Sequence, residues 1–373
     1  MPKNEAAWLV ARNDRLQVRE APYPEPGAGE VVVRNHAVAV NPVDWIVPYL
    51  AGLPMFPWIK RPFILGSDLA GEVVAVGGGV TEVKVGDRVL AMAAGACKQR
   101  NRAAEGAFQA YTIVLPRLTT VIPDHLSYAE AAVVPLGVTT AACGLFQSDL
   151  LALELPTAKP KARDQWVIIW GGATSVGGNA IQLAVAAGYE VVATASPKNF
   201  AYVKALGATT VFDYRSATVV ADIRRALETR TLAGALAIGV GSASACVAVV
   251  SACEGNRFVA MATPAVSFER APTGAARTFW LIPPFARMIA TTATTTIRAR
   301  LTKVGVKFIW GGALVDNEVS QIIYSDFLPR ALSDGRYTPA PPPQVVGCGL
   351  DAIPGALKIQ RSGVSARKIV VAL

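Results

Sequence analysis

The chain has 373 residues, of which 52% are hydrophobic and 17% are charged, and this length and composition predict two folded domains. The many apolar residues, with glycines and prolines dispersed along the chain, exclude intrinsic disorder, a collagen-like protein and a coiled coil. The net charge of +9 comes from scattered basic residues without interleaved aromatic ones. We therefore expect no nucleic-acid binding; a solvated surface, an acidic protein partner or an anionic cofactor accounts for the charge.

The first 130 residues are predicted to be rich in β-structure, because short β-branched runs at 31–34, 71–76 and 88–92 are separated by Gly, Pro and Asp. A helical period follows from Pro135, through Val138 to Leu155. Strands and helices then alternate, which is typical of a doubly wound parallel sheet. The predicted strands lie at 166–170, 190–194, around 211–212 and at 255–261, and the predicted helices at 177–187, 199–206 and 219–229.

The stretch Ala233–Cys253 is long and uncharged enough to cross a bilayer. Its Ala, Gly and Ser content and its central Gly239-Val240-Gly241-Ser242 instead favour a buried strand, a glycine turn and a buried helix, with a membrane span as the alternative. Further on, residues 262–300 are rich in Thr and Pro and are predicted to be a long variable region, before a strand at 308–310 and a helix at 318–332.

Five cysteines without a CxxC pair are not typical of a disulfide framework, which favours a reducing compartment. The N-terminal segment MPKNEAAWLV also lacks the apolar run of a secretory signal. We therefore expect a cytoplasmic protein that does not bind membranes.

The strand at 166–170 leads directly into Gly171-Gly172-Ala173-Thr174-Ser175-Val176-Gly177-Gly178, which opens a helix. Glycines allow the backbone to turn sharply and to approach a pyrophosphate, while the N–H groups at the helix start attract the anion. The order of strand, glycine turn, helix and second strand predicts a dinucleotide site.

The end of the second strand indicates which nucleotide is bound. An acidic residue at this place would hydrogen-bond the ribose of NAD, but the sequence reads Thr194-Ala195-Ser196-Pro197-Lys198-Asn199. A hydroxyl, an ammonium and an amide suit a 2′-phosphate, so we expect NADPH. Ser196 is also typical of a helix N-cap followed by proline, and the two roles are compatible because they share one geometry.

At this point the chain as a whole resembles the medium-chain dehydrogenase/reductase superfamily, in its zinc-free quinone-oxidoreductase branch. The resemblance lies in the motifs NPVDW (41–45), LGSDLAGEV (65–73), VGDRV (85–89), GAFQAY (106–111), the glycine turn and SARKIVV (365–371). Within the superfamily the chain is most similar to fungal trans-acting enoyl reductases that serve polyketide synthases, such as the lovastatin enoyl reductase, through PLGVTTA (135–141), ASPKNF (195–200) and VFDYR (211–215).

The resemblance implies an α/β protein with a GroES-like β-rich domain, residues 1–136 and 316–373, and an inserted Rossmann domain, residues 137–315. It also allows a test for zinc, which needs converging Cys, His or carboxylate ligands. The chain has only His36 and His125, carries Gly66-Ser67-Asp68 where zinc alcohol dehydrogenases have Gly-His-Glu, and has Cys97 alone where they have a four-cysteine lobe. We expect no metal and assign the histidines no chemistry.

By the resemblance, Thr140 holds the nicotinamide or the substrate carbonyl, although a threonine here is equally typical of a helix N-cap. The glycine turn and the resemblance together place these residues at the cofactor: Val43, Asp44, Gly171, Gly172, Thr174, Ser175, Val176, Gly177, Ser196, Lys198, Asn199, Tyr214, Thr263, Val364 and Ser365. The substrate cleft is expected to be lined by Ala141, Gly144, Leu145, Ser148, Gly305 and Phe308, with small residues leaving room for an acyl chain.

One residue departs from the family's pattern. Relatives commonly have a lysine where this chain has Ile46, and isoleucine can neither donate a proton nor polarise a carbonyl. Three hypotheses therefore stand: an NADPH-dependent trans-enoyl reductase acting on a polyketide attached to an acyl carrier protein, a quinone or free enone reductase, and a non-reducing cyclase, isomerase or binding partner that keeps the nucleotide fold. The first leads, with the carrier protein as partner and the chain as a monomer or weak dimer.

Overall fold

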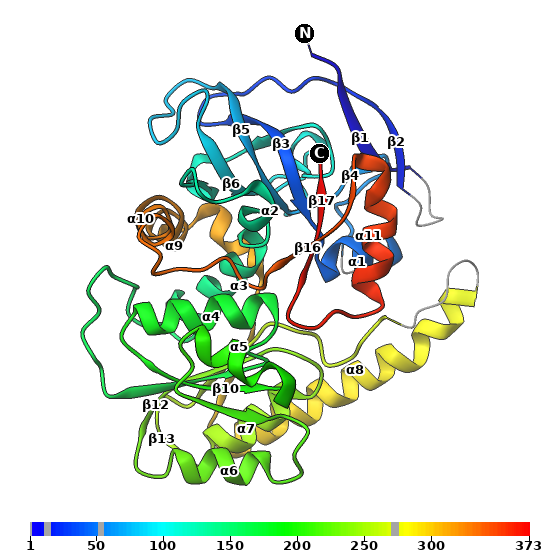
Figure 1. Ribbon diagram of the computed structural model, residues 1–373. Coiled ribbons are helices and arrows are strands. Elements are labelled where there is room, and N and C mark those ends of the chain that lie inside the picture. The colour runs from blue at the N-terminus through cyan, green and yellow to red at the C-terminus, as the bar shows by residue number, and fades with distance from the viewer. Residues whose placement is uncertain (1, 11–15, 51–55, 270–275) are drawn as a thin grey trace. The chain divides into compact units, whose positions relative to one another are not determined.

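The computed structural model describes residues 2–10, 16–50, 56–269 and 276–373 (Figure 1). The chain is divided into two compact units: unit 1 consists of Met1–Thr139 and Gly312–Leu373, and unit 2 of Thr140–Gly311. Unit 2 is therefore an insertion in the sequence of unit 1.

Unit 1 is built on β-sheet, as the β-branched runs predict. The larger sheet has the order β16-β17-β3-β5-β6-β8, with β7 also pairing with β3, and a smaller sheet has the order β2-β1-β4. The strands of the larger sheet are β3 (Val31–Ala39), β5 (Asp68–Val76), β6 (Arg88–Met92), β7 (Tyr111–Val114), β8 (Thr119–Val121), β16 (Pro343–Cys348) and β17 (Lys368–Ala372). Those of the smaller sheet are β1 (Asn4–Leu9), β2 (Leu16–Ala21) and β4 (Phe63–Ile64).

The central strand of the larger sheet, β3, positions the polar groups of unit 1. Ala39 at its end pairs with Asp68 of β5 on one side and with Val370 of β17 on the other. Because both neighbours run antiparallel to β3, Asp68 and Lys368, which start their strands, lie where β3 ends.

Helices and tight turns complete unit 1. The α-helices are α1 (Pro42–Leu50), α2 (Tyr128–Ala131), α9 (Glu318–Gln321), α10 (Leu328–Ser333) and α11 (Ile353–Arg361), and α3 (Pro135–Phe146) crosses the sequence limit between the units. Shorter turns are η1 (Ala103–Glu105), η2 (Pro116–Leu118), η4 (Gly311–Asp316), η6 (Leu350–Ala352) and the π-helical η5 (Ile322–Phe327). The helix predicted over 318–332 is thus present, with a π-turn in its middle.

Unit 2 contains the predicted doubly wound sheet, in which every strand pair is parallel. Its order is β11-β10-β9-β12-β14-β15, and β13 also pairs with β12. The strands are β9 (Gln165–Trp170), β10 (Glu190–Ala195), β11 (Thr210–Asp213), β12 (Thr231–Ala237), β13 (Glu254–Gly255), β14 (Phe258–Met261) and β15 (Gly305–Phe308).

Helices cover both faces of this sheet, as right-handed crossovers require. In Figure 1, α4 and α5 lie on one face, and α6 and α7 lie on the other. Their bounds are α4 (Ser175–Ala186), η3 (Pro197–Asn199) with α5 (Phe200–Ala205), α6 (Val219–Ala226) and α7 (Ser242–Val250), and a long helix, α8 (Ala276–Leu301), follows β14. The core between sheet and helices is apolar and includes Ile168, Ala235, Val247 and Val259.

Three predicted elements differ from the structure. The helix predicted from Pro135 to Leu155 starts at Pro135 but ends at Phe146, and the strand predicted at 308–310 is β15, which starts at Gly305. The largest difference lies in 262–300, where most of the predicted variable region is α8, although 270–275 lie outside the described residues. Threonines and two prolines lower the intrinsic preference for helix, so packing of one face against unit 2 must stabilise α8.

Two apolar segments bear on the question of a membrane span. The stretch Ala233–Cys253 forms strand β12, a glycine turn and helix α7, so the prediction of a buried strand and helix is confirmed. Among the described residues, one helical stretch, Tyr128–Phe146, is apolar and long enough to cross a membrane, and 78% of its apolar window is buried inside the protein. Core helices of soluble proteins meet the same criterion, so this stretch is weak evidence for a span.

Candidate functional site

The glycine turn after β9 is held by hydrogen bonds to β10 and to the first turn of α4. The Gly171 N–H donates to Thr194 Oγ1 at 3.0 Å, and Thr174 caps α4 by accepting from the Gly177 N–H at 3.0 Å. Gly171 has φ +89°, and a Cβ on Gly177 would lie 2.2 Å from the Gly171 carbonyl oxygen. Both positions therefore require glycine, as the sequence predicts for a phosphate-binding turn.

This turn lies at the switch point of the sheet. The chain leaves β9 toward β10 on one side and later returns to β12 on the other, and ligands of doubly wound sheets bind outside the strand ends at such a point. Beyond β12, the Gly239 N–H donates to Thr263 Oγ1 at 3.0 Å, which ties the ends of β12 and β14 together. Ser175 Oγ, at the start of α4, is buried and has no hydrogen-bond partner. An unpaired hydroxyl beside helix N–H groups fits a dinucleotide pyrophosphate.

The residues predicted to recognise the 2′-phosphate follow β10. Ser196 is the N-cap of η3 and Pro197 is its first residue, as predicted, but the Ser196 side chain makes no capping hydrogen bond. Lys198 is exposed, and Asn199 is half-buried. Tyr214, which follows β11, is exposed with Arg215 stacked on its ring at 5.2 Å. The Ser196 hydroxyl and the Lys198 ammonium thus stand on the turn that follows β10, the strand next to the glycine turn.

The predicted substrate residues of unit 2 differ in exposure. Ala141, Gly144 and Leu145 are buried in α3, Gly305 is half-buried at the start of β15, and Ser148 and Phe308 are exposed. A Cβ on Gly144 would lie 2.7 Å from Ile309 and 2.8 Å from Leu236. The small residue at 144 therefore allows α3 to pack closely on the sheet. That Gly144 and the other five residues line a substrate cleft stays a prediction.

Four polar residues of unit 1 form a buried network where β3, β5 and β17 meet. Lys368 Nζ lies 2.8 Å from Asp68 Oδ2 and 2.5 Å from Asn41 Oδ1, and Asn41 Nδ2 donates to Asp68 Oδ2 at 2.8 Å. The Leu136 N–H donates to Asp68 Oδ1 at 2.6 Å. Asp44 joins the network at the start of α1, where its carboxylate accepts the Asn41 N–H at 2.8 Å.

Two carboxyl groups share one ammonium in this network, so their charges are not balanced. Burial raises the pKa of Asp44 to about 7, and the Asp68 carboxylate acts in the same direction, whereas the Asn41 N–H and Lys368 oppose the rise. The hydrogen bond that the Asp44 carboxylate accepts from the Asn41 N–H ties the third residue of α1 to the residue before the helix. The predicted place of Asp44 at the cofactor stays a prediction.

The other predicted residues of unit 1 lie on α1 and on the loop before β17. Val43 and Ile46 are half-buried, and Val364 and Ser365 are exposed. Thr140 is in the sixth position of α3, so the alternative interpretation of this threonine as a helix N-cap is wrong. The roles assigned to these residues by resemblance stay predictions.

Sequence reasoning missed the groups that hold the turn and α3 in place. Thr194 is fully buried and accepts the Gly171 N–H, and Thr139 Oγ1 lies 2.7 Å from the Tyr324 hydroxyl, which donates to the Pro135 carbonyl at 2.9 Å. These pairs are far apart in the chain. A polar residue inside an otherwise apolar run, as at Thr194, is the only signal that could have pointed to one of them.

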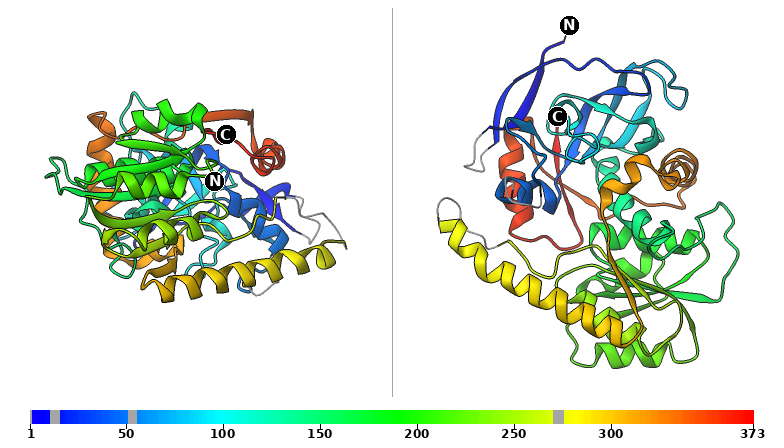
Figure 2. Two further views of the ribbon diagram at one scale, coloured as in Figure 1. Left: turned by 90° about the horizontal axis from the view of Figure 1, so that it is seen from below. Right: turned by 180° about the vertical axis from the view of Figure 1, so that it is seen from behind.

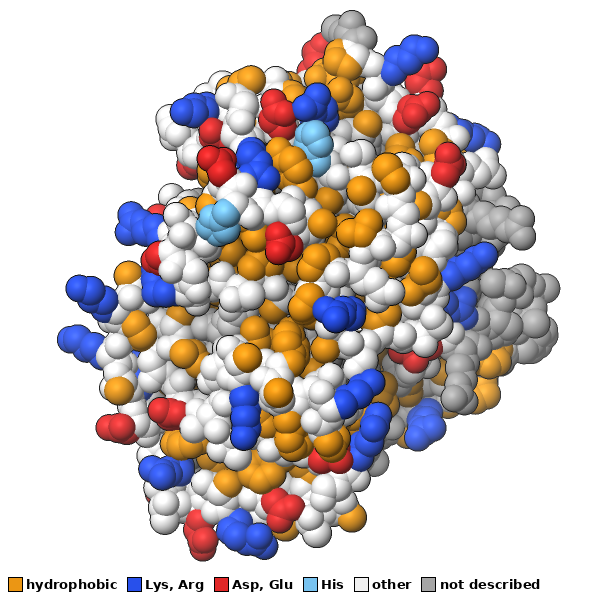
Figure 3. Space-filling model, viewed as in Figure 1, with side chains coloured by type: hydrophobic (Ala, Val, Ile, Leu, Met, Phe, Trp, Pro, Cys, Tyr) orange, Lys and Arg blue, Asp and Glu red, His pale blue; other side chains and the backbone are white. Residues whose placement is uncertain are grey.

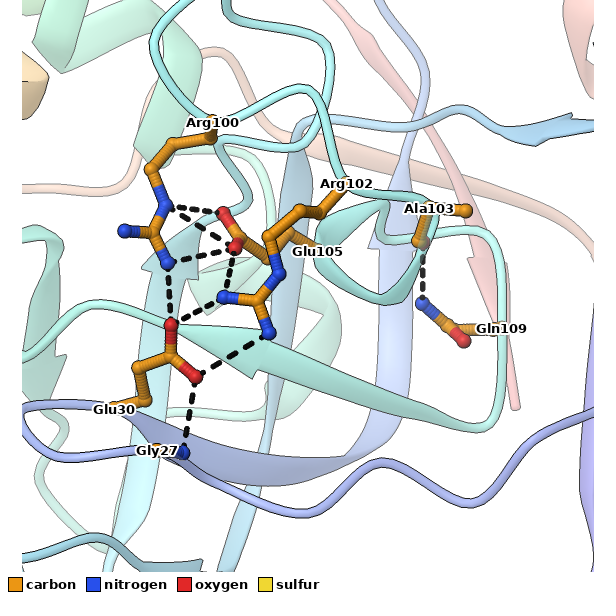
Figure 4. Close-up of polar contacts among 7 residues, drawn as sticks. All are labelled: Gly27, Glu30, Arg100, Arg102, Ala103, Glu105 and Gln109. Atoms are coloured by element: carbon orange, nitrogen blue, oxygen red, sulfur yellow. Dashed lines mark hydrogen bonds and ion pairs between the residues drawn. The ribbon is translucent and has the colours of Figure 1, made fainter.

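The densest basic run of the sequence, residues 98–102, is largely neutralised. Arg100 and Arg102 both form ion pairs with Glu105, at 2.7 and 2.9 Å, and both contact Glu30, whose other oxygen accepts the Gly27 N–H at 3.0 Å (Figure 4). On the face that Figure 3 shows, basic side chains are spread singly and mixed with acidic ones. Neither observation favours a nucleic-acid surface.

The described residues contain no group of three or more His, Cys, Asp or Glu side chains that could hold a metal ion. Asp68, at the place of the zinc-ligand motif, is instead paired with Lys368. The expectation of a zinc-free enzyme stays a prediction.

Comparison with known proteins agrees with this geometry. Residues 27–135 match the model of the alcohol dehydrogenase GroES-like domain. The chain is 49% identical over 376 residues to "Dehydrogenase pigH" of Monascus ruber, covering all of both chains, and 34% identical over 373 residues to "Trans-enoyl reductase himH" of Aspergillus japonicus, covering 99% of this chain and 97% of the other. Among solved structures, the CurK enoyl reductase matches with a TM-score of 0.72 at 18% identity, covering 100% of this chain and 99% of the other.

A GroES-like unit with an inserted doubly wound unit that carries a dinucleotide turn defines a medium-chain dehydrogenase or reductase. The chain belongs to the medium-chain dehydrogenase/reductase superfamily, and it is an oxidoreductase of this superfamily, whose dehydrogenases bind nicotinamide cofactors.

Proposed function

We propose that this protein is an NADPH-dependent trans-acting enoyl reductase, which reduces the α,β-double bond of a polyketide acyl thioester carried by an acyl carrier protein. In this reaction the β-carbon gains a hydride, the α-carbon gains a proton, and the nicotinamide is oxidised. The relatives named as trans-enoyl reductases support the reaction class, because himH matches this chain over nearly its full length.

The observation that carries the choice of cofactor is the turn after β10. Ser196 and Lys198 occupy the place where an acidic residue would select NAD. The Ser196 hydroxyl is not used as a cap, and Lys198 is exposed, so both can contact a 2′-phosphate. The glycine turn, Ser175 and the start of α4 would hold the pyrophosphate.

When bound, NADPH would supply the hydride, and the protein supplies position and electrostatics. Ile46 provides no proton, so the α-carbon is protonated by water or by a hydroxyl such as that of Thr140. In the non-reducing alternative, Ile46 would instead shape a drier pocket, in which a new ammonium would be poorly solvated.

The reaction is tested by measuring NADPH consumption and product mass with four samples: an enoyl thioester on a carrier protein, the same thioester on N-acetylcysteamine, a quinone, and no substrate. We expect one NADPH oxidised per saturated thioester formed. Product formation without NADPH oxidation would support the non-reducing alternative. Turnover of the quinone alone would support a quinone reductase.

Ile46→Lys is a second test of the reaction. The variant should keep or raise enoyl turnover if the protein is an ordinary reductase, and it should lower the native activity if the protein is a diverged, non-reducing enzyme.

The choice of cofactor is tested by calorimetric titration with NADPH and NADH, which does not require turnover. Removing one charged contact to the 2′-phosphate should weaken NADPH binding by about tenfold to a hundredfold and leave NADH binding unchanged. Lys198→Ala is the test variant. Lys204→Ala, another exposed lysine on the following helix, is the control and should change neither affinity. Equal affinities of wild type for both nucleotides would contradict the assignment.

A further inference from the structure

Helix α8 packs on unit 2 along one face only. Leu281, Thr295 and Ala299 are buried on that face, and α8 contacts α7 and β15. Figure 2 shows α8, in yellow, as one long helix whose C-terminal part lies against the rest of unit 2. Because the buried residues recur at helical spacing, the opposite side of the helix faces away from the unit.

That opposite side is apolar. Ile282, Ile289 and Ile297 have 62%, 67% and 57% of their surface exposed, and Ala286 and Ala293 between them are also exposed. These five residues, which we call the α8 stripe, recur every three or four positions and so form one continuous row. Single exposed apolar residues are ordinary, but a continuous row on a monomer marks an interaction surface.

Charges on α8 indicate what kind of partner fits. The segment 276–301 contains four arginines and no Asp or Glu. Arg287 and Arg298 are exposed and eleven residues apart, which is close to three helical turns, so both lie on one side of the helix. Each is about 100° around the helix from the stripe residue that precedes it, Ala286 or Ile297. Arg300 is exposed near its end. An apolar row on a helix whose charged residues are all arginines is complementary to a helix that has an apolar ridge and acidic neighbours.

A second copy of this chain fits the same face less well. Two α8 helices packed on one another would bring arginines together without a single acidic residue to pair with them. Like charges placed against one another at an interface are unfavourable.

We propose that the α8 stripe, with Arg287 and Arg298, is the docking surface for an acidic helical protein. Resting on the proposed function, this partner is the carrier protein that delivers the acyl thioester. Carrier proteins are acidic, and a protein of net charge +9 attracts them over a distance before the apolar rows meet. The docking surface thus lies outside the residues assigned to nucleotide and substrate.

The test measures binding and turnover in separate assays. The probe is an acidic bacterial acyl carrier protein carrying a crotonyl thioester, with crotonyl-N-acetylcysteamine as the small substrate. Fluorescence anisotropy of the labelled carrier gives its Kd at low and at high salt. The variants are Ile289→Ser and Arg287→Glu, and their matched controls are Ile359→Ser, on exposed α11, and Lys204→Glu, on α5 at the other edge of the sheet.

We expect both α8 variants to raise the Kd for the carrier by about tenfold, as for other residues central to an interface, and the wild-type Kd to rise with salt. Turnover of the small thioester should be unchanged, and both controls should bind as wild type does. If the chain reduces neither thioester but binds the carrier through α8, the docking surface stands and the proposed function fails.

Three results would overturn the docking surface. The first is that the carrier does not bind, or that it binds wild type and both α8 variants with the same Kd. This result would overturn the docking surface even if both thioesters are reduced, in which case the proposed function stands. The second is a wild-type dimer in light scattering that Ile289→Ser dissociates, which would assign the stripe to a second copy. The third is that wild type binds phosphatidylglycerol vesicles and Ile289→Ser does not, while both bind the carrier equally. This result would assign the α8 stripe to a lipid surface.

Discussion

Replacing Lys368 by methionine should strongly destabilise the protein. Methionine keeps a flexible apolar stem but has no donor for Asp68 Oδ2, which lies 2.8 Å from Lys368 Nζ. The Asp68 side chain is 0% exposed and that of Lys368 is 5% exposed, so water cannot replace the lost ammonium. The Asp68 charge would then be buried beside Asp44 without a counter-charge.

Breaking a buried ion pair by removing one partner costs about 3–5 kcal/mol. The lost contact of Lys368 with Asn41 adds to this, while the hydrogen bonds that Asp68 accepts from the Leu136 N–H and Asn41 Nδ2 partly offset it. We therefore expect a loss of about 4 kcal/mol in the free energy of unfolding at pH 7.

The measurement is urea denaturation of wild type, Lys368→Met and Asp68→Asn/Lys368→Met. The double variant removes both charges, so it should regain more than half of the lost stability. Lys358→Met changes an exposed lysine of α11 and should stay within about 0.5 kcal/mol of wild type. The reasoning is refuted if Lys368→Met loses less than about 1 kcal/mol, or if the double variant is no more stable than the single one.

Two further predictions concern the pH dependence of stability and the glycine turn. Because burial raises the pKa of Asp44 from 3.8 to about 7, the folded state holds a proton that the unfolded state releases, and wild-type stability should fall by about 2–3 kcal/mol between pH 5 and pH 8. Urea denaturation of Asp44→Asn should show a smaller fall, and an unchanged slope would contradict the role of Asp44. Gly177→Ala places a Cβ 2.2 Å from the Gly171 carbonyl oxygen, so it should cost about 1–3 kcal/mol and weaken nucleotide binding in calorimetry. Gly355→Ala, where nothing lies within 4 Å, is the control and should be neutral or stabilising.

The sequence by itself predicted the parts of the fold that depend on neighbouring residues. The apolar run at 166–170 with the glycines after it, and the strand and helix within Ala233–Cys253, are found where the pattern puts them. The predicted positions of Ser196 before the helical turn and of Pro197 as its first residue are also found, although the Ser196 side chain makes no capping hydrogen bond. In each case one stretch of chain contains both the hydrophobic period and the turn residues that specify the structure.

The sequence also supplied the residue types of the nucleotide site, because a phosphate-binding turn is a local motif. It supplied no information on Thr194, whose hydroxyl holds the turn from the next strand. Nor did it predict α8, whose Thr and Pro content argues against a helix, because the packing of Leu281 and Ala299 outweighs intrinsic preference.

Only the tertiary structure decided how charges are paired. Asp68 and Lys368 are 300 positions apart, and they meet because β5 and β17 both pair with β3. Arg100 and Arg102, which the sequence presents as a basic run, are turned toward Glu30 and Glu105. Local patterns determine whether a residue lies in a strand, helix or turn, but strand order and register determine which charges share a low-dielectric interior, where their interaction is strongest.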